Sequence, residues 1–121
     1  MDYPPYESYD ANFQPTGFDV ALARELGTRL GYRVEFLDIP FEGLLPAVQT
    51  GQVDAGIAAI SVTPDRQQNV DFSSVYYTDD ASTLSRPGSG IKITAPNQLA
   101  NYRVGVQRGT VYEQWLKQTL I

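Results

Sequence analysis

The sequence predicts an α/β domain in which an open, mainly parallel sheet is flanked by helices. Stretches with apolar residues at helical spacing alternate along the chain with short apolar stretches, an order typical of this class. The run VDAGIAAI, residues 53–60, is almost continuously apolar, as a strand buried on both faces of a parallel sheet is. With 121 residues, 42% of them hydrophobic, the chain is long enough for one small domain with a core.

The clearest predicted helix is GFDVALARELGTRLGY, residues 17–32. Its apolar residues Phe18, Leu22 and Leu26 recur every four positions, the spacing that places side chains on one face of a helix. Gly31 then stands where a helix is expected to end, because glycine adopts the left-handed conformation of a C-terminal cap without steric cost.

Capping patterns mark two more helices. Thr63 is expected to cap a helix that has Pro64 at its first position, since proline lacks only an N–H group that would be unpaired there. Thr110 and Glu113 have the spacing of a capping box at the start of a C-terminal helix. The remaining ranges expected to be helical are a short helix at residues 41–51, a helical turn at 95–102 and the C-terminal helix at 109–120.

Three strands complete the predicted α/β order. Val34 and Phe36 alternate with charged residues in the stretch 33–39, the buried run 53–60 follows the short helix, and RVGVQ occupies residues 103–107. Parallel strands need crossover connections, and the predicted helices between these stretches provide them.

The composition excludes several classes of function. The chain contains no Cys and no His, so it has no disulfide, no Ser-His-Asp triad and no usual zinc ligand. Its net charge of −5 and scattered basic residues argue against nucleic-acid binding. The adjacent Asp79 and Asp80 have no third ligand nearby in the sequence and are interpreted as a solvated turn, not a metal site. We therefore expect a binding role, with no cofactor and no metal.

Candidate ligand-binding residues are expected at the carboxyl ends of the strands, where open α/β sheets bind their ligands. Ser61 directly follows the run 53–60, and Arg66 stands at the start of the helix that Thr63 caps. A planar guanidinium binds a carboxylate through two parallel hydrogen bonds. The aromatic residues Phe41 and Tyr3 would enclose a small ligand. Alternatively, Arg66 neutralises a neighbouring aspartate, and the two aromatic residues belong to the core.

Five motifs, in this order, resemble the type II periplasmic solute-binding proteins of the polar amino-acid-binding family, ABC transporter substrate-binding family 3. They are YPPYE, GFDVALARELGTRLGYRVEF, FEGLLPAVQTGQVDAGIAAISVTPDR, VDFSSVYY and YRVGVQRGTVYEQWL. The resemblance implies a fold with two lobes that close over one amino acid, with Arg66 on the ligand's α-carboxylate. The binding residues that it implies are Tyr3, Phe41, Ala59, Ile60, Ser61, Arg66, Gln107 and Thr110. Gln107 and Thr110 have the alternative role of a helix cap.

The resemblance also implies a domain organisation. Residues 1–85 would form the first lobe without its opening strand, and residues 86–121 would form the hinge and the first strand–helix unit of the second lobe. We therefore expect a protein roughly twice as long, with its signal segment outside this sequence. Residues 103–107 are expected to fill the place of the missing strand, within the chain or by exchange in a homodimer, because unpaired strand edges favour such pairing.

Three functions fit this family. The first is the periplasmic or extracellular receptor of an ABC importer, free or membrane-anchored, which binds a free polar amino acid and docks on the transporter's membrane subunits. The second is the ligand-binding module of a sensor or ligand-gated receptor. The third is a dehydratase of a cyclic amino-acid precursor on the same fold, which would need a catalytic acid from the second lobe.

Overall fold

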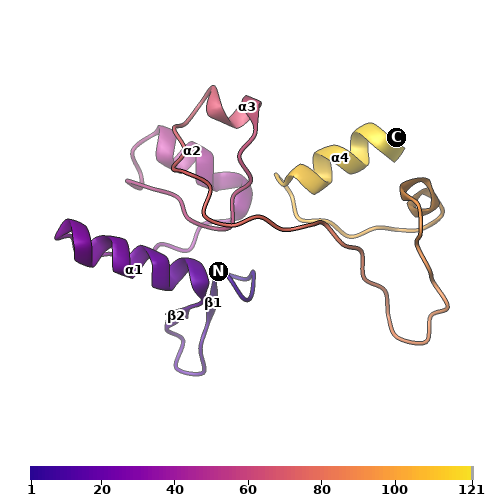
Figure 1. Ribbon diagram of the computed structural model, residues 1–121, viewed down its shortest axis with the longest axis horizontal. Helices are drawn as coiled ribbons and strands as arrows, with labels where there is room; N and C mark the ends of the chain where they lie inside the picture. The colour runs from indigo at the N-terminus through magenta and orange to yellow at the C-terminus, as the bar shows by residue number, and fades with distance from the viewer. Residues whose placement is uncertain (121) are drawn as a thin grey trace. The chain divides into compact units, whose positions relative to one another are not determined.

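The computed structural model describes residues 1–120, and the chain divides into two compact units, Met1–Phe72 and Ser73–Ile121. Each unit is described by itself. In chain order, the elements are β1 (Ser8–Tyr9), β2 (Pro15–Thr16), α1 (Phe18–Leu30), the 3-10 helix η1 (Phe41–Gly43), α2 (Leu44–Gln49), α3 (Pro64–Gln67), the 3-10 helix η2 (Pro96–Asn101) and α4 (Val111–Leu120) (Figure 1).

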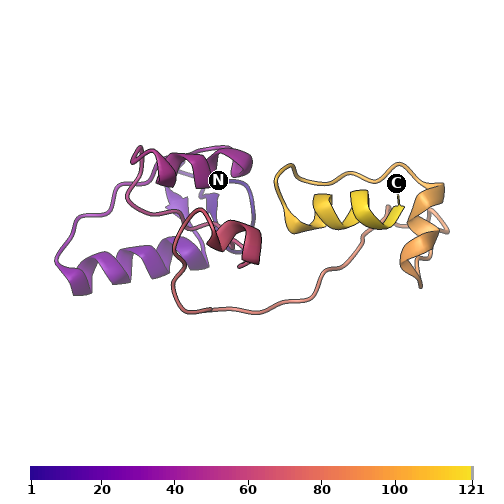
Figure 2. The same cartoon turned by 90° about the horizontal axis from the view of Figure 1, so that it is seen from above.

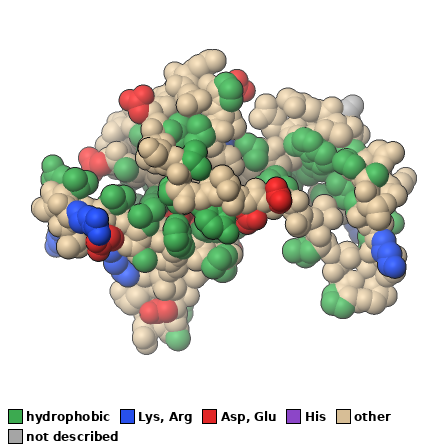
Figure 3. Space-filling view, in the orientation of Figure 1, with side chains coloured by type: hydrophobic (Ala, Val, Ile, Leu, Met, Phe, Trp, Pro, Cys, Tyr) green, Lys and Arg blue, Asp and Glu red, His purple; other side chains and the backbone are tan. Residues whose placement is uncertain are grey.

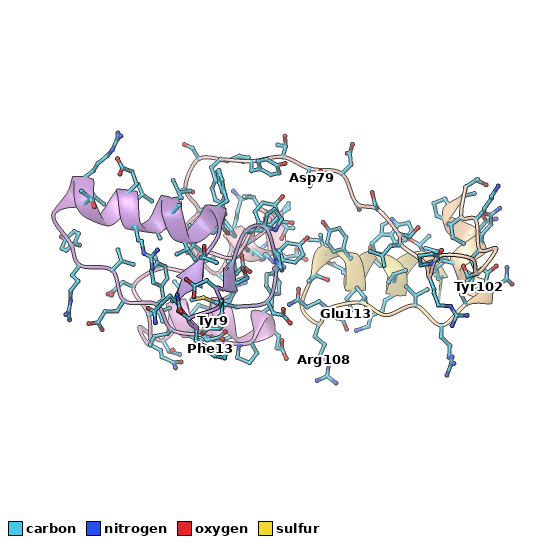
Figure 4. All side chains as sticks on the ribbon, turned by 90° about the horizontal axis from the view of Figure 1, so that it is seen from below. Tyr9, Phe13, Asp79, Tyr102, Arg108 and Glu113 are labelled. Atoms are coloured by element: carbon cyan, nitrogen blue, oxygen red, sulfur yellow. The ribbon has the colours of Figure 1, made fainter. Side chains whose placement is uncertain are left out.

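A small antiparallel hairpin opens the first unit. Ser8 of β1 pairs with Thr16 of β2, and Tyr9 pairs with Pro15. The turn between the strands is held by the side chain of Asp10, whose Oδ1 accepts hydrogen bonds from the backbone N–H groups of residues 12 and 14 at 2.8 and 2.9 Å. Tyr9 and Phe13 lie on this hairpin (Figure 4).

Helix α1 begins against the turn that precedes the hairpin. The backbone N–H groups of Phe18 and Asp19 donate hydrogen bonds to the carbonyl oxygens of Pro5 and Tyr6, at 3.0 and 2.9 Å. These bonds satisfy N–H groups that have no partner inside a helix, and no side chain caps α1 at Gly17. The hairpin consequently lies at the N-terminal end of α1 (Figures 1 and 2).

Helices α2 and α3 lie together in the first unit (Figure 1). The side chain of Gln49 at the end of α2 donates a hydrogen bond to Asn69, just beyond α3, at 3.4 Å. Val20 of α1 and Ala47 of α2 are the buried apolar residues of this unit. The buried apolar core of this unit is therefore small, and α1 and α2 each contribute to it.

The second unit contains η2 and α4, which pack against each other, and Leu99 of η2 is its buried apolar residue. The start of α4 carries the predicted capping pattern: the Glu113 N–H donates to Thr110 Oγ1 at 3.3 Å, and Glu113 Oε2 accepts from the Gly109 N–H at 2.7 Å. Arg108 and Glu113 both lie at this end of the helix (Figure 4).

All the predicted helices are confirmed, with small shifts of their ends. Gly31 caps α1 in the left-handed conformation, with a φ angle of 76°. Thr63 caps α3, and Pro64 is the first residue of that helix. Helix α2 contains Pro46 in its first turn, as expected, and ends at Gln49.

The three predicted strands are wrong as individual elements. Within residues 1–120, the sheet has only the two strands β1 and β2, and the ranges 33–39, 53–60 and 103–107 run without strand pairing. A strand exists only through hydrogen bonds to a neighbour, and no described residue pairs with these ranges.

The idea that residues 103–107 replace a missing strand within the chain is also wrong. Val104 and Val106 stay exposed and outside any sheet. The structure of the single chain gives no support to an exchanged homodimer. Hydrophobic side chains reach the surface of both units instead (Figure 3).

We predict that Gly17→Ala destabilises the first unit by about 2–4 kcal/mol. Gly17 has a φ angle of 121°, and a Cβ atom there would lie 2.3 Å from the Tyr6 carbonyl oxygen, so the turn would have to separate from α1. Urea denaturation measures the change in the free energy of unfolding.

Gly31→Ala is the matched control for this substitution. Its φ angle of 76° also disfavours alanine, but a Cβ atom there would meet nothing within 4 Å, so the expected cost is about 1 kcal/mol. If both substitutions lower the free energy of unfolding equally, the contact between the turn and α1 contributes nothing to stability.

Candidate functional site

Arg66 is held in place by residues that lie close to it in the sequence. Its backbone N–H donates to the capping Thr63 Oγ1 at 3.3 Å, and its Nη1 donates to the Ser61 carbonyl oxygen at 2.6 Å. The guanidinium carbon lies 5.6 Å from the centroid of the Phe41 ring, within the range of a cation–π contact. The structure thus brings together three predicted site residues: Phe41, Ser61 and Arg66.

The surroundings of Arg66 lower the pKa of its guanidinium, because burial removes water from the charged group. Arginine nevertheless remains protonated in proteins. A partly desolvated, permanent cation that is oriented on an aromatic face is suited to bind a carboxylate, since the interaction strengthens where water is excluded.

The residues that precede Ser61 are held from a distant part of the chain. The Ala59 N–H donates a hydrogen bond to Asp19 Oδ2 at 2.6 Å, across 40 residues of sequence. Ala59 has a φ angle of 46°, which is the left-handed region that alanine rarely occupies. Ile60, the other predicted site residue in this stretch, is half-buried.

Tyr3 lies in the turn that docks on α1. Its ring stacks on that of Tyr6, with 5.4 Å between the centroids and 19° between the planes. Its backbone pairs with Glu7 as an isolated antiparallel bridge. Tyr3 is exposed, and its role in enclosing a ligand stays a prediction.

The predicted site residues of the second unit form a helix cap. Thr110 Oγ1 donates to the Gln107 carbonyl oxygen at 2.8 Å and accepts from the Glu113 N–H. This is the structural alternative recognised in the sequence. A role of Gln107 and Thr110 in ligand binding stays a prediction.

Two buried carboxyl groups near the site were not predicted as important from the sequence. Asp19 is 0% exposed, and Glu7 is 9% exposed. Glu7 Oε2 has no hydrogen-bond partner among the described residues. The pKa of Glu7 is raised to about 7, first by burial and then by the charge of Asp19, while the N-terminal amino group opposes the shift. Both residues lie inside motifs that carry the family resemblance, YPPYE and GFDVALARELGTRLGYRVEF, but nothing local in the sequence indicates their burial, and Asp19 resembles an ordinary acidic residue in the first turn of a helix.

The described residues contain no group of three or more acidic, His or Cys side chains that could hold a metal ion. Over the same part of the chain, no helix combines the length and the apolar character required to cross a membrane.

Comparison with known sequences defines the class of protein. The chain belongs to the bacterial extracellular solute-binding proteins, family 3, whose family model matches residues 1–120. The arginine-binding extracellular protein ArtP of Bacillus subtilis is 39% identical over 113 residues, which are 93% of this chain and 43% of that protein. The histidine-binding periplasmic protein of Salmonella typhimurium is 34% identical over 111 residues, 92% of this chain and 42% of that protein. The chain thus spans less than half the length of these relatives.

Solved structures confirm the fold class, a partial type II periplasmic-binding-protein fold. The ancestral amino acid-binding protein AncCDT-1, a precursor of cyclohexadienyl dehydratase, matches with a TM-score of 0.92 and 39% identity, over 98% of this chain and 53% of that one. An arginine-bound variant of domain 1 of the arginine-binding protein from T. maritima matches with a TM-score of 0.61 and 38% identity, over 63% of this chain and 59% of that one.

We predict that protonation of Glu7 stabilises the fold. The folded state holds a proton up to a pH of about 7, whereas the unfolded state releases it near 4.5. The folded state therefore binds more protons between these values, and stability falls as the pH rises through this window. At about 1.4 kcal/mol per pH unit, the contribution is at most about 3 kcal/mol.

Glu7→Gln is the matched variant, because it keeps the shape of the side chain and removes its titration. Urea denaturation from pH 4 to pH 8 should show that the stability difference between the two proteins changes through this window. A difference that does not depend on pH would contradict the raised pKa.

Proposed function

We propose that this chain carries the amino-acid site of the extracytoplasmic receptor of an ABC importer, with Arg66 binding the ligand's α-carboxylate. The observation that carries the proposal is the placement of Arg66, oriented by the Ser61 carbonyl group and the Phe41 ring at the start of α3. The match to a family of solute-binding proteins over residues 1–120 supports it.

The other site residues take roles that follow from their positions. The exposed Tyr3 ring and the Phe41 ring would enclose the ligand, since aromatic faces supply large apolar contact areas. The exposed Ser61 hydroxyl and the backbone of Ala59 and Ile60 would meet the ligand's polar groups.

We infer that the ligand is a basic amino acid, with arginine as the first candidate. A relative with 39% identity is named an arginine-binding protein, and the net charge of this chain is −5, which attracts cationic ligands. Domain 1 of the T. maritima protein is itself arginine-bound. This supports direct tests on the 121-residue chain.

The receptor would act outside the cytoplasm, in the periplasm or at the cell exterior, where its relatives are named as periplasmic and extracellular proteins. Its partners would be the free amino acid and the membrane subunits of the importer. A sensor module would use the same site, and the sequences that flank this chain would distinguish the two.

We predict that Arg66→Ala weakens arginine binding by about 30-fold to several thousand-fold, because one partner of a desolvated charge pair is lost. Arg66→Lys should also weaken binding, since an ammonium group cannot make the two parallel contacts of a guanidinium. Isothermal titration calorimetry measures the affinity.

Arg29→Ala is the control for the loss of positive charge, because the Arg29 side chain is 76% exposed and pairs with Glu25 on α1. It should change the affinity by less than about threefold. An Arg66→Ala protein that is folded and binds arginine as tightly as the original would end the carboxylate-clamp proposal.

The second candidate function is that of a dehydratase. An ancestral cyclohexadienyl dehydratase, AncCDT-3, matches with a TM-score of 0.60 and 37% identity, over 63% of this chain and 32% of that one. A general acid must reach its substrate, and the Glu7 carboxyl group, which has a pKa near neutrality, is buried. We therefore favour binding without turnover.

We predict that the chain binds arginine without converting a cyclohexadienyl substrate. Incubation with that substrate, followed by ultraviolet absorbance, tests for an aromatic product, with a cyclohexadienyl dehydratase as the positive control. Product above the uncatalysed background would favour the dehydratase instead.

A further inference from the structure

The carboxylate of Asp19 occupies an unusual position for a residue in the first turn of a helix. Acidic side chains in this position commonly interact with the helix dipole while facing water. Asp19 is 0% exposed, and its Oδ2 accepts a hydrogen bond from the Ala59 N–H at 2.6 Å. Burying a carboxylate costs free energy unless hydrogen bonds compensate for the lost water. The hydrogen bond from the Ala59 N–H supplies part of that compensation and links α1 to residue 59.

The donor of this bond is a strained residue. With a φ angle of 46°, Ala59 is in the left-handed region, which is sterically unfavourable for a non-glycine residue. A hydrogen bond that a buried carboxylate accepts is strong enough to offset such a cost. Such strain persists where surrounding contacts hold the residue in place, and Asp19 provides the contact.

The position of Ala59 determines the direction of the chain that follows. Ser61 lies two residues further on, and its carbonyl oxygen holds the Arg66 guanidinium at 2.6 Å. A series of contacts therefore leads from the Asp19 side chain, through the Ala59 backbone and the Ser61 carbonyl group, to Arg66, the proposed carboxylate clamp. A change in the φ angle of Ala59 would redirect the Ser61 carbonyl group and release Arg66.

We propose that Asp19 is a positioning residue for the amino-acid site, which holds Ala59 in the left-handed conformation and thereby orients Ser61 and Arg66. The proposal rests on the proposed function and deepens it, because it assigns part of the affinity to a residue that lies on α1. Asp19 also holds the turn that carries Tyr3 against α1, because the Asp19 N–H donates a hydrogen bond to the Tyr6 carbonyl oxygen.

The test uses arginine as the ligand, the 121-residue chain and calorimetry. Asp19→Ala removes the acceptor and should weaken arginine binding by about tenfold or more. Asp19→Asn keeps an oxygen acceptor of the same shape and should weaken it by less than about threefold. Glu25→Ala, which removes an exposed acidic group from the same helix, is the control and should leave the affinity unchanged.

Rescue by glycine separates positioning from general stability. Glycine adopts positive φ angles without steric cost, so Ala59→Gly in the Asp19→Ala background should restore about threefold or more of the lost affinity. The Ala59 amide proton supplies a second readout by NMR: its downfield shift, typical of a short hydrogen bond to a carboxylate, should disappear in Asp19→Ala.

The outcomes distinguish this proposal from the proposed function. If Arg66→Ala abolishes binding while a folded Asp19→Ala protein keeps its affinity, the positioning role is overturned and the clamp stands. If Arg66→Ala has no effect, the proposed function itself fails. Should Asp19→Ala not fold, Ala59→Val tests the same point with Asp19 in place, because a β-branched residue disfavours positive φ. Unchanged arginine affinity in Ala59→Val would overturn the proposal.

Discussion

The docking of the first turn of α1 is the constraint on which the first unit depends. The N–H groups of Phe18 and Asp19 bind the carbonyl groups of the preceding turn, and the Asp19 side chain binds the Ala59 N–H from the same place. The absence of a side chain at Gly17 permits the close approach, because a Cβ atom would collide with the Tyr6 carbonyl group. The N-terminal end of α1 therefore holds both the turn that carries Tyr3 and the segment that begins at Ala59 and leads to Arg66.

The helices could be predicted from the sequence because their signals are local. Thr63 caps α3 by accepting a hydrogen bond from the N–H three residues further on, and Gly31 ends α1; each signal acts within one or two turns of its position. The strands could not be predicted in the same way. Residues 53–60 have the composition of a buried strand, but a strand also requires a partner, and sequence composition does not show whether the partner is present.

The candidate site residues also differ in whether a local sequence pattern or only the fold indicates them. Ser61 and Arg66 could be proposed from the sequence because they are five residues apart, at the start of a helix with a recognisable cap. Phe41 could be proposed because an aromatic ring can enclose a small ligand. Asp19 was missed because its importance comes from a contact with a residue 40 positions away, and Glu7 was missed because burial alone makes it unusual. Non-local contacts and burial are properties of the fold, so no local pattern of residue types indicates them.

Burial shifts the pKa of two charged groups of the first unit, Arg66 and Glu7, with different consequences. Desolvation lowers the pKa of Arg66, but a guanidinium begins from a value so high that it keeps its proton, so a clamp made of arginine remains charged. Desolvation of Glu7 moves its pKa to about 7, where a carboxyl group changes charge. The proposed contact of Arg66 with a carboxylate would therefore not depend on pH in this range, while the stability of the turn beside α1 would follow the proton on Glu7. The pH dependence of folding and the chemistry of binding thus belong to different residues of the same unit.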